Sequence, residues 1–81
     1  MSRVRLSAHA EEEMRKARAT RSDVHAALAW SGEERPGGSP GTRLLPNRYI
    51  GRGRVMSLVV ARKDYGILIV TLWVRRGRAN S

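Results

Sequence analysis

The sequence contains no cysteine and no phenylalanine, and its 81 residues include only two tryptophans, two tyrosines and three prolines. The lack of cysteine excludes a disulfide scaffold, a cysteine-ligated zinc site and a thiol nucleophile. The longest apolar run, residues 67–74, is far too short to cross a bilayer. The first residues carry arginines with no apolar stretch behind them, unlike a secretory signal. We therefore expect a cytoplasmic protein without membrane contact, folded as a single domain over residues 1–81.

Acidic residues are also few, and the chain is strongly basic. Seven Asp and Glu stand against sixteen Lys and Arg, fourteen of them arginine, which gives a net charge of +9 at pH 7. A guanidinium grips phosphate through two parallel hydrogen bonds and stays protonated, so the first interpretation is affinity for nucleic acid. The alternative is compositional, because a GC-rich genome enriches arginine through codon usage alone.

The first part of the chain predicts one strand and two helices. Residues 3–6 alternate polar and apolar side chains, as in an edge strand. Ser7 is a good N-cap for a helix that begins at Ala8. Thr20 and Asp23 have the spacing of a capping box, which predicts the start of a second helix.

The second part predicts a loop and three strands. Residues 32–42 hold most of the glycine and proline and predict a mobile surface loop without a regular hydrogen-bond ladder. Strands are expected at 43–50, 55–62 and 67–75. The fold class is therefore α+β in the order β-α-α-β-β-β, with an antiparallel sheet and two helices packed on one face.

The last strand is apolar on both of its alternating faces. We assign Leu68, Val70, Leu72 and Val74 to the helices and Ile67, Ile69, Thr71 and Trp73 to the other face. Two helices cover only one face of a sheet, so Thr71 and Trp73 would need a dimer mate, a partner protein or a substrate. The alternative is that the long loop folds over them.

Two segments share their spacing with a known group of bacterial proteins. The segments are Ser7-Ala8-His9-Ala10 through Met14 to Thr20, Asp23-Val24 and Leu28, and Ile69-Val70-Thr71-Leu72-Trp73. They resemble a family of small bacterial domains grouped with the RelE and BrnT toxins. The chain departs from the family where two first-helix arginines are expected, because Glu13 and Ala17 occupy those positions.

The resemblance implies the fold of the barnase, EndoU, colicin and RelE ribonucleases and an RNA-cleaving toxin held in check by an antitoxin. It also implies chemistry without a metal or cofactor. A base takes the proton of a ribose 2′-hydroxyl, cations hold the phosphate, and an acid protonates the leaving oxygen. The RNA would be free or bound to the ribosome.

Candidate site residues follow from that chemistry. The catalytic candidates are His9, whose imidazole can accept or donate a proton, Tyr49, which can donate a proton or stack a base, and Arg54 as a phosphate clamp. The RNA-binding candidates are Arg15, Lys16, Arg18, Arg48, Arg52, Arg75 and Arg76. Each has a plainer interpretation: His9 packs at the sheet edge, the hairpin is an ordinary exposed turn, and the final arginines are a solvated tail.

Three functions remain open at this point. The first is a RelE- or BrnT-like toxin that cleaves RNA. The second is a non-catalytic RNA-binding or regulatory module of the same fold, which the replaced arginines would suit. The third is a dimerising or partner-binding domain that uses the apolar sheet face.

Overall fold

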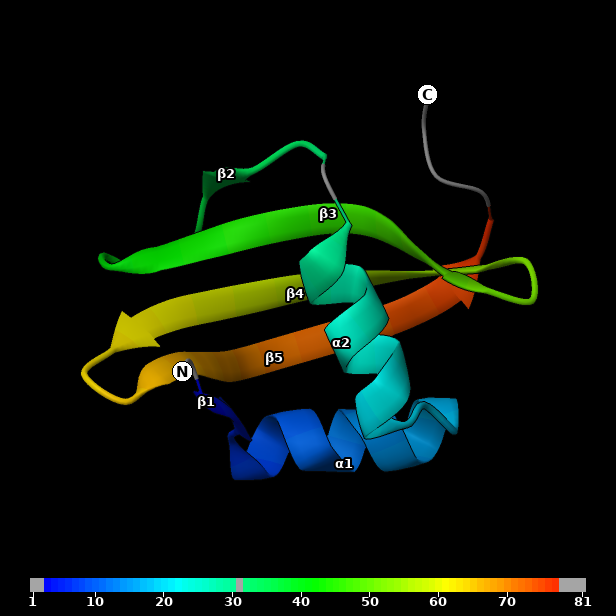
Figure 1. Cartoon of the computed structure of the whole chain (residues 1–81), viewed down its shortest axis with the longest axis horizontal. Coiled ribbons are helices and arrows are strands. Elements are labelled where there is room, and N and C mark those ends of the chain that lie inside the picture. The colour runs from blue at the N-terminus through cyan, green and yellow to red at the C-terminus, as the bar shows by residue number, and fades with distance from the viewer. Residues whose placement is uncertain (1–2, 31, 78–81) are drawn as a thin grey trace.

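The computed structural model describes residues 3–30 and 32–77. The elements follow in the order β1 (Arg3–Leu6), α1 (Ala8–Ala17), α2 (Arg21–Ala29), β2 (Arg35–Pro36), β3 (Thr42–Gly51), β4 (Arg54–Lys63) and β5 (Gly66–Arg76). They form an α+β fold in which both helices contribute to one core against a single curved sheet (Figure 1). No helix within the described residues is long and apolar enough to cross a membrane.

The sheet is mixed and has five strands, which corrects the predicted antiparallel sheet of four. Its order is β1-β5-β4-β3-β2. β1 pairs in parallel with β5, from Arg3 opposite Gly66 to Leu6 opposite Ile69, whereas the other pairs are antiparallel. The two helices carry the chain from β1 to the far side of the sheet, so β1 is left to align with the last strand. The sequence of a four-residue strand does not indicate whether the strand pairs in parallel or antiparallel.

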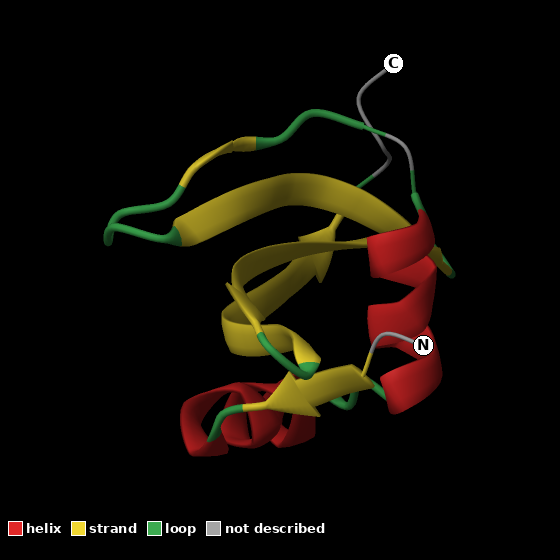
Figure 2. Ribbon diagram, turned by 60° about the vertical axis from the view of Figure 1, so that its left-hand side comes forward, coloured by secondary structure: helices red, strands yellow, loops and turns green. Residues whose placement is uncertain are grey.

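The fifth strand lies inside the segment predicted as an irregular loop. Arg35 and Pro36 pair with Leu44 and Arg43, and Gly37 N donates to the carbonyl of Thr42 at 2.9 Å. Figure 2 shows this segment arching beyond the outer edge of β3. The glycines and prolines therefore form a tight return onto β3, and the expectation of no ladder hydrogen bonds is wrong for two residues.

Both helix starts agree with the predicted caps. Ser7 Oγ accepts from Ala10 N at 3.0 Å, and the same hydroxyl donates to the carbonyl of Val70 at 2.6 Å. Thr20 and Asp23 exchange side-chain and backbone hydrogen bonds of 3.2 and 3.0 Å, which completes a capping box. The caps confirm the predicted starts of both helices.

The structure corrects half of the predicted assignment of β5 side chains to the two faces of the sheet. Leu72 and Val74 face the helices as expected, and Thr71 and Trp73 face away. Ile67 and Ile69 also join the helix-side core, although we had placed them on the other face. The cause is a bulge: Val59 pairs with Thr71 while its neighbour Val60 pairs with Ile69, so one extra residue, Val70, shifts the phase of the strand.

The predicted loop does not cover the sheet face that carries Trp73. Residues 37–42 instead border a hollow on the helix side, together with Leu28 of α2 and with Leu45 and Val60, which belong to the core. The alternative that the loop folds over Thr71 and Trp73 is therefore wrong. We call the side of the sheet away from the helices the outer face.

Candidate nucleic-acid interface

Arginines gather at one end of the molecule, which we call the basic end. It comprises residues 18–23, where α1 passes into α2, residues 49–54, which form the β3–β4 hairpin, and residues 73–77 at the end of β5. Arg54 Nη2 lies 3.3 Å from Asp23 Oδ2 and joins the hairpin to the start of α2. The six arginines of the basic end are Arg18, Arg21, Arg52, Arg54, Arg75 and Arg76. Asp23 is the single acidic residue in these three segments.

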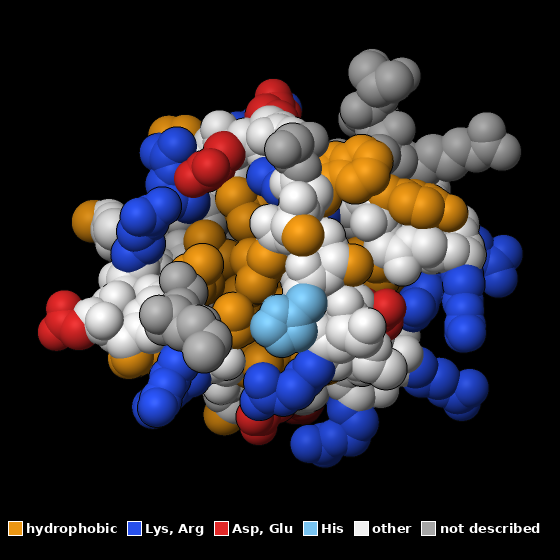
Figure 3. All heavy atoms as spheres, in the orientation of Figure 1, with side chains coloured by type: hydrophobic (Ala, Val, Ile, Leu, Met, Phe, Trp, Pro, Cys, Tyr) orange, Lys and Arg blue, Asp and Glu red, His pale blue; other side chains and the backbone are white. Residues whose placement is uncertain are grey.

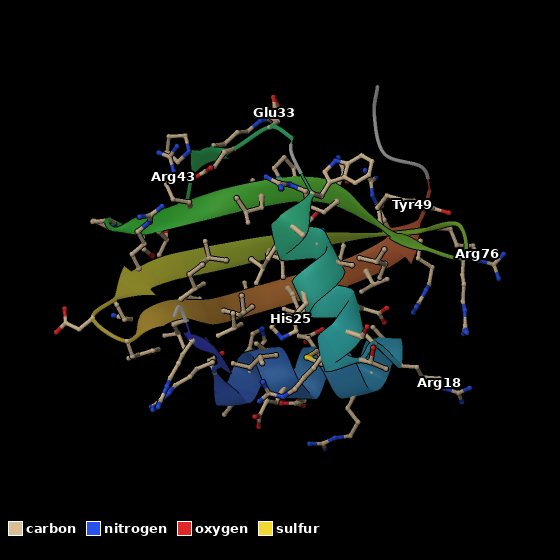
Figure 4. The ribbon with its side chains drawn as sticks, viewed as in Figure 1. Arg18, His25, Glu33, Arg43, Tyr49 and Arg76 are labelled. Carbon is tan, nitrogen blue, oxygen red and sulfur yellow. The ribbon has the colours of Figure 1, made fainter. Side chains whose placement is uncertain are left out.

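The positive side chains project outward at this end. Figure 3 shows Lys and Arg spheres along its rim, and Figure 4 shows Arg18 and Arg76 extending away from the ribbon. All of the arginines except Arg54 are exposed. Six positive charges with one negative neighbour create a local field that favours a polyanion.

The hairpin geometry explains why Arg52 is so accessible. Gly51, Arg52 and Gly53 have positive φ angles of 94°, 56° and 68°. Glycine adopts this region without a Cβ penalty, so two glycines allow a tight turn around one side chain. Arg52 therefore lies at the tip of the turn with its side chain in solvent.

Two arginines of the basic end are positioned by neighbours. Arg54 and Asp23 form a partly buried ion pair, with 24% and 17% of their side-chain areas exposed. Asp23 Oδ2 also accepts from Thr20 N, so the pair is anchored to the capping box. On the outer face, Arg75 Nη2 donates to Asn47 Oδ1. These contacts fix two guanidinium groups while the others remain solvated.

Arg48, predicted to bind RNA, has a different place. It is only 4% exposed and lies on the helix side of β3. Its guanidinium donates to the carbonyls of Trp30 and of Glu33, the latter at 2.9 Å, beyond the C-terminal end of α2. A cation at a helix C-terminus satisfies carbonyls that have no helical partner and opposes the helix dipole. We therefore remove Arg48 from the RNA-binding set.

The basic residues within α1 are less suited to bind phosphate than those at the basic end. Lys16 Nζ lies 3.7 Å from a Glu12 carboxylate oxygen and 3.6 Å from one of Glu13. Arg15 is exposed on the same helix, where glutamates precede it. Local acidic neighbours lower the potential that these two cations present to a phosphate.

The three predicted catalytic residues do not come together. His9 is exposed at the second position of α1, and α1 begins next to β1, away from the β3–β4 hairpin (Figure 1). Tyr49 pairs with Val55 on the outer face, and its hydroxyl accepts from Gly53 N at 3.4 Å. Arg54 pairs with Arg76 on the helix side. His9 is therefore not placed to transfer a proton at the basic end.

The sequence interpretation missed Arg21 and the hollow on the helix side. Arg21 directly follows the Thr20 cap, and a residue at the first position of a helix is expected to be exposed, which could have identified it from the sequence. The hollow has a volume of about 1180 Å³ and an apolar floor that includes Leu45, Val60 and Ile67 (Figure 3). It arises from the return of residues 37–42 beside α2, which has no signature in the sequence.

Comparisons with known proteins add no assignment. The chain matches no family model, no curated protein and no solved structure. Within residues 3–30 and 32–77, no three His, Asp or Glu side chains lie close enough together to hold a metal ion. A proposal for the function therefore rests on the arrangement of the chain's own residues.

Proposed function

We propose that this protein binds RNA through the basic end and that it belongs to the RelE- and BrnT-like group of small bacterial domains. The observation that carries the binding proposal is the convergence of six arginines on one end with Asp23 as their single acidic neighbour. The membership proposal rests on the spacing of the resembling segments and on the order of elements, in which one strand and two helices precede a meander of strands.

The physical basis is phosphate neutralisation. Each guanidinium that contacts a phosphate releases condensed counterions from the RNA, so the affinity falls as salt rises. Five exposed arginines engaging one phosphate each predict a slope of about −3 to −4 in a plot of log K against log salt for single-stranded RNA. Tyr49, beside this cluster, offers a ring for a base.

RNA cleavage is the second candidate. It is favoured by Tyr49, whose hydroxyl lies at the arginine-rich hairpin, in reach of the same bound RNA. In such a toxin the ribose 2′-oxygen would attack the phosphorus and lose its proton to water, while Tyr49 protonates the leaving 5′-oxygen and the arginines hold the phosphate, without His9. An antitoxin partner, or a homodimer, belongs to this second proposal.

The test compares two double variants that remove equal charge. Arg52→Ala with Arg76→Ala removes two exposed arginines of the basic end. Arg35→Ala with Arg43→Ala removes two arginines that pair with Glu33 and Glu34 at 2.7 and 3.0 Å beside β2. The affinity for a labelled single-stranded RNA is measured by fluorescence anisotropy at several salt concentrations, and the RNA is then run on a gel.

We expect the Arg52 and Arg76 pair to lower affinity strongly and to reduce the salt slope by about 1.4, since each lost contact is worth about 0.7. The Arg35 and Arg43 pair is expected to bind nearly as the parent does. Equal loss in both variants would contradict a local interface. Cleaved RNA in the parent and intact RNA in Tyr49→Phe would support the second candidate.

A further inference from the structure

The outer face exposes a tryptophan that packing against the helices does not require. Trp73 is 44% exposed, whereas its neighbour Leu72 is buried in the core. Its cross-strand partner is Ser57, a small side chain whose hydroxyl accepts from Asn47 N at 3.0 Å. Ser57 is too small to cover the indole, and the 44% exposure shows that the neighbouring side chains leave much of the ring in solvent. The ring is therefore available to a planar ligand.

Arg75 links Trp73 to Tyr49 on the same face. It follows Trp73 by two residues, so both side chains leave β5 on the outer side. The contact from Arg75 to Asn47 runs from β5 to β3, and its guanidinium therefore crosses β4. This crossing accounts for the burial of Val55 and Ser57, which are 1% and 3% exposed on a face that no helix covers. Arg75 and Tyr49 are both register neighbours of Val55.

The order across the face is thus aromatic ring, guanidinium, aromatic ring. Surfaces that bind single-stranded RNA combine these groups, because unpaired bases stack on aromatic rings and arginines contact the phosphates between them. Bases in a duplex already stack on one another and are not free to do so.

Charge distinguishes RNA from a second copy of this chain here. None of the five described strands contains an acidic residue, and they contribute ten Lys and Arg. Two copies meeting symmetrically through this face would bring like charges together, including Arg5, which lies opposite Leu68, and Arg75. A polyanion has the complementary charge.

We propose that the outer face is a stacking platform for single-stranded RNA, with bases on Trp73 and Tyr49 and the backbone directed by Arg75 towards Arg52. The proposal rests on RNA binding at the basic end and specifies its ligand as unpaired rather than duplex RNA. It also gives a role to Trp73, which lies beside the arginine cluster on β5.

The chain contains two tryptophans, Trp30 and Trp73, and this permits a direct optical test. Trp30→Phe leaves Trp73 as the only tryptophan, and Trp73→Phe leaves Trp30, which is 42% exposed on the C-terminal side of α2. Each variant is titrated with a uridine octamer and with a duplex RNA of equal length, and the tryptophan emission is followed. In parallel, Trp73→Ala is compared with Trp30→Ala by anisotropy, with circular dichroism to confirm folding.

We expect the octamer to quench Trp73 with the same midpoint as the anisotropy titration and to leave Trp30 nearly unchanged. Trp73→Ala should weaken octamer binding by about 5- to 150-fold, the range for one stacked base, and duplex binding much less.

The results separate this proposal from the binding proposal beneath it. Salt-dependent octamer binding with unchanged Trp73 emission and full affinity in Trp73→Ala would overturn the stacking platform and leave RNA binding at the basic end intact. No binding of either RNA would overturn both proposals. Trp73 emission that changes with protein concentration alone, together with a dimer in sedimentation, would assign the outer face to self-association and overturn the platform.

Discussion

The buried guanidinium of Arg48 donates to the main-chain carbonyl of Trp30 and so joins β3 to the C-terminal end of α2. The helix has no basic residue in its own last turn. Arg48, eighteen residues later in the chain, supplies the missing cation, and the loop between them must return to the sheet for this to happen.

Replacing Arg48 should cost stability rather than RNA affinity. Arg48→Met keeps an unbranched apolar stem but leaves the carbonyls of Trp30 and Glu33 without their donor. We expect the free energy of unfolding in urea to fall by about 2–4 kcal/mol. Arg52→Ala, at an exposed turn, is the control and should leave stability within about 0.5 kcal/mol of the parent. Full stability with lost RNA binding in Arg48→Met would contradict its role as a cap.

The parallel pairing of β1 predicts a strict need for glycine at position 66. Gly66 has a φ of 137°, and a Cβ there would lie 2.3 Å from the carbonyl oxygen of Arg3. Gly66→Ala should therefore destabilise the protein by more than about 2 kcal/mol in chemical denaturation. Gly38→Ala is the matched control, because no atom lies within 4 Å of the added methyl group. Equal stability of the two variants would argue against the β1–β5 pairing.

Arg54 of β4 and Arg76 of β5 are cross-strand neighbours. Comparing their alanine variants should separate an effect on stability from an effect on RNA binding. Arg54→Ala removes the partly buried contact with Asp23 and is expected to cost about 1 kcal/mol of folding free energy as well as RNA affinity. Arg76 is exposed, so Arg76→Ala should reduce affinity alone. Thermal unfolding and anisotropy on the same preparations distinguish the two. A purely structural effect in both variants would remove this part of the basic end from the interface.

His9→Ala should leave RNA binding unchanged, and it should leave any cleavage unchanged too. The residue lies at the second position of α1, and this helix begins next to β1, away from the hairpin (Figure 1). Tyr49→Phe, which keeps the ring and removes the hydroxyl, is the informative comparison. If His9→Ala abolished RNA cleavage while folding normally, the active site would have to be sought at the start of α1.

Local features of the fold were predictable from the sequence, and long-range ones were not. The caps at Ser7 and Thr20 depend on side chains within three residues, and both are present in the structure. The direction of β1 depends on where two helices deliver the chain, and the phase of β5 depends on one extra residue at Val70. The carbonyl of that residue accepts from Ser7, so the bulge is coupled to a cap sixty-three positions earlier. Neither is encoded in a local pattern.

The candidate site shows the same division. The sequence predicted a hairpin in which arginines flank Tyr49, and Arg52 is exposed there as expected. Arg48, in the same stretch, is buried because a bulge between Leu45 and Arg48 alters the pairing of β3 just before it, and α2 ends above it. Composition identified the charge, whereas the fold determined which arginines reach solvent.

The most direct test of RNA binding at the basic end is a nitrogen-15 NMR titration with a uridine octamer. We predict saturable shifts of the backbone amides of residues 49–54 and 73–77 and of Arg18, with little change at 35–43, where the arginines are already paired with glutamates. Shifts centred on residues 35–43, or no saturable shifts at low salt, would contradict the account.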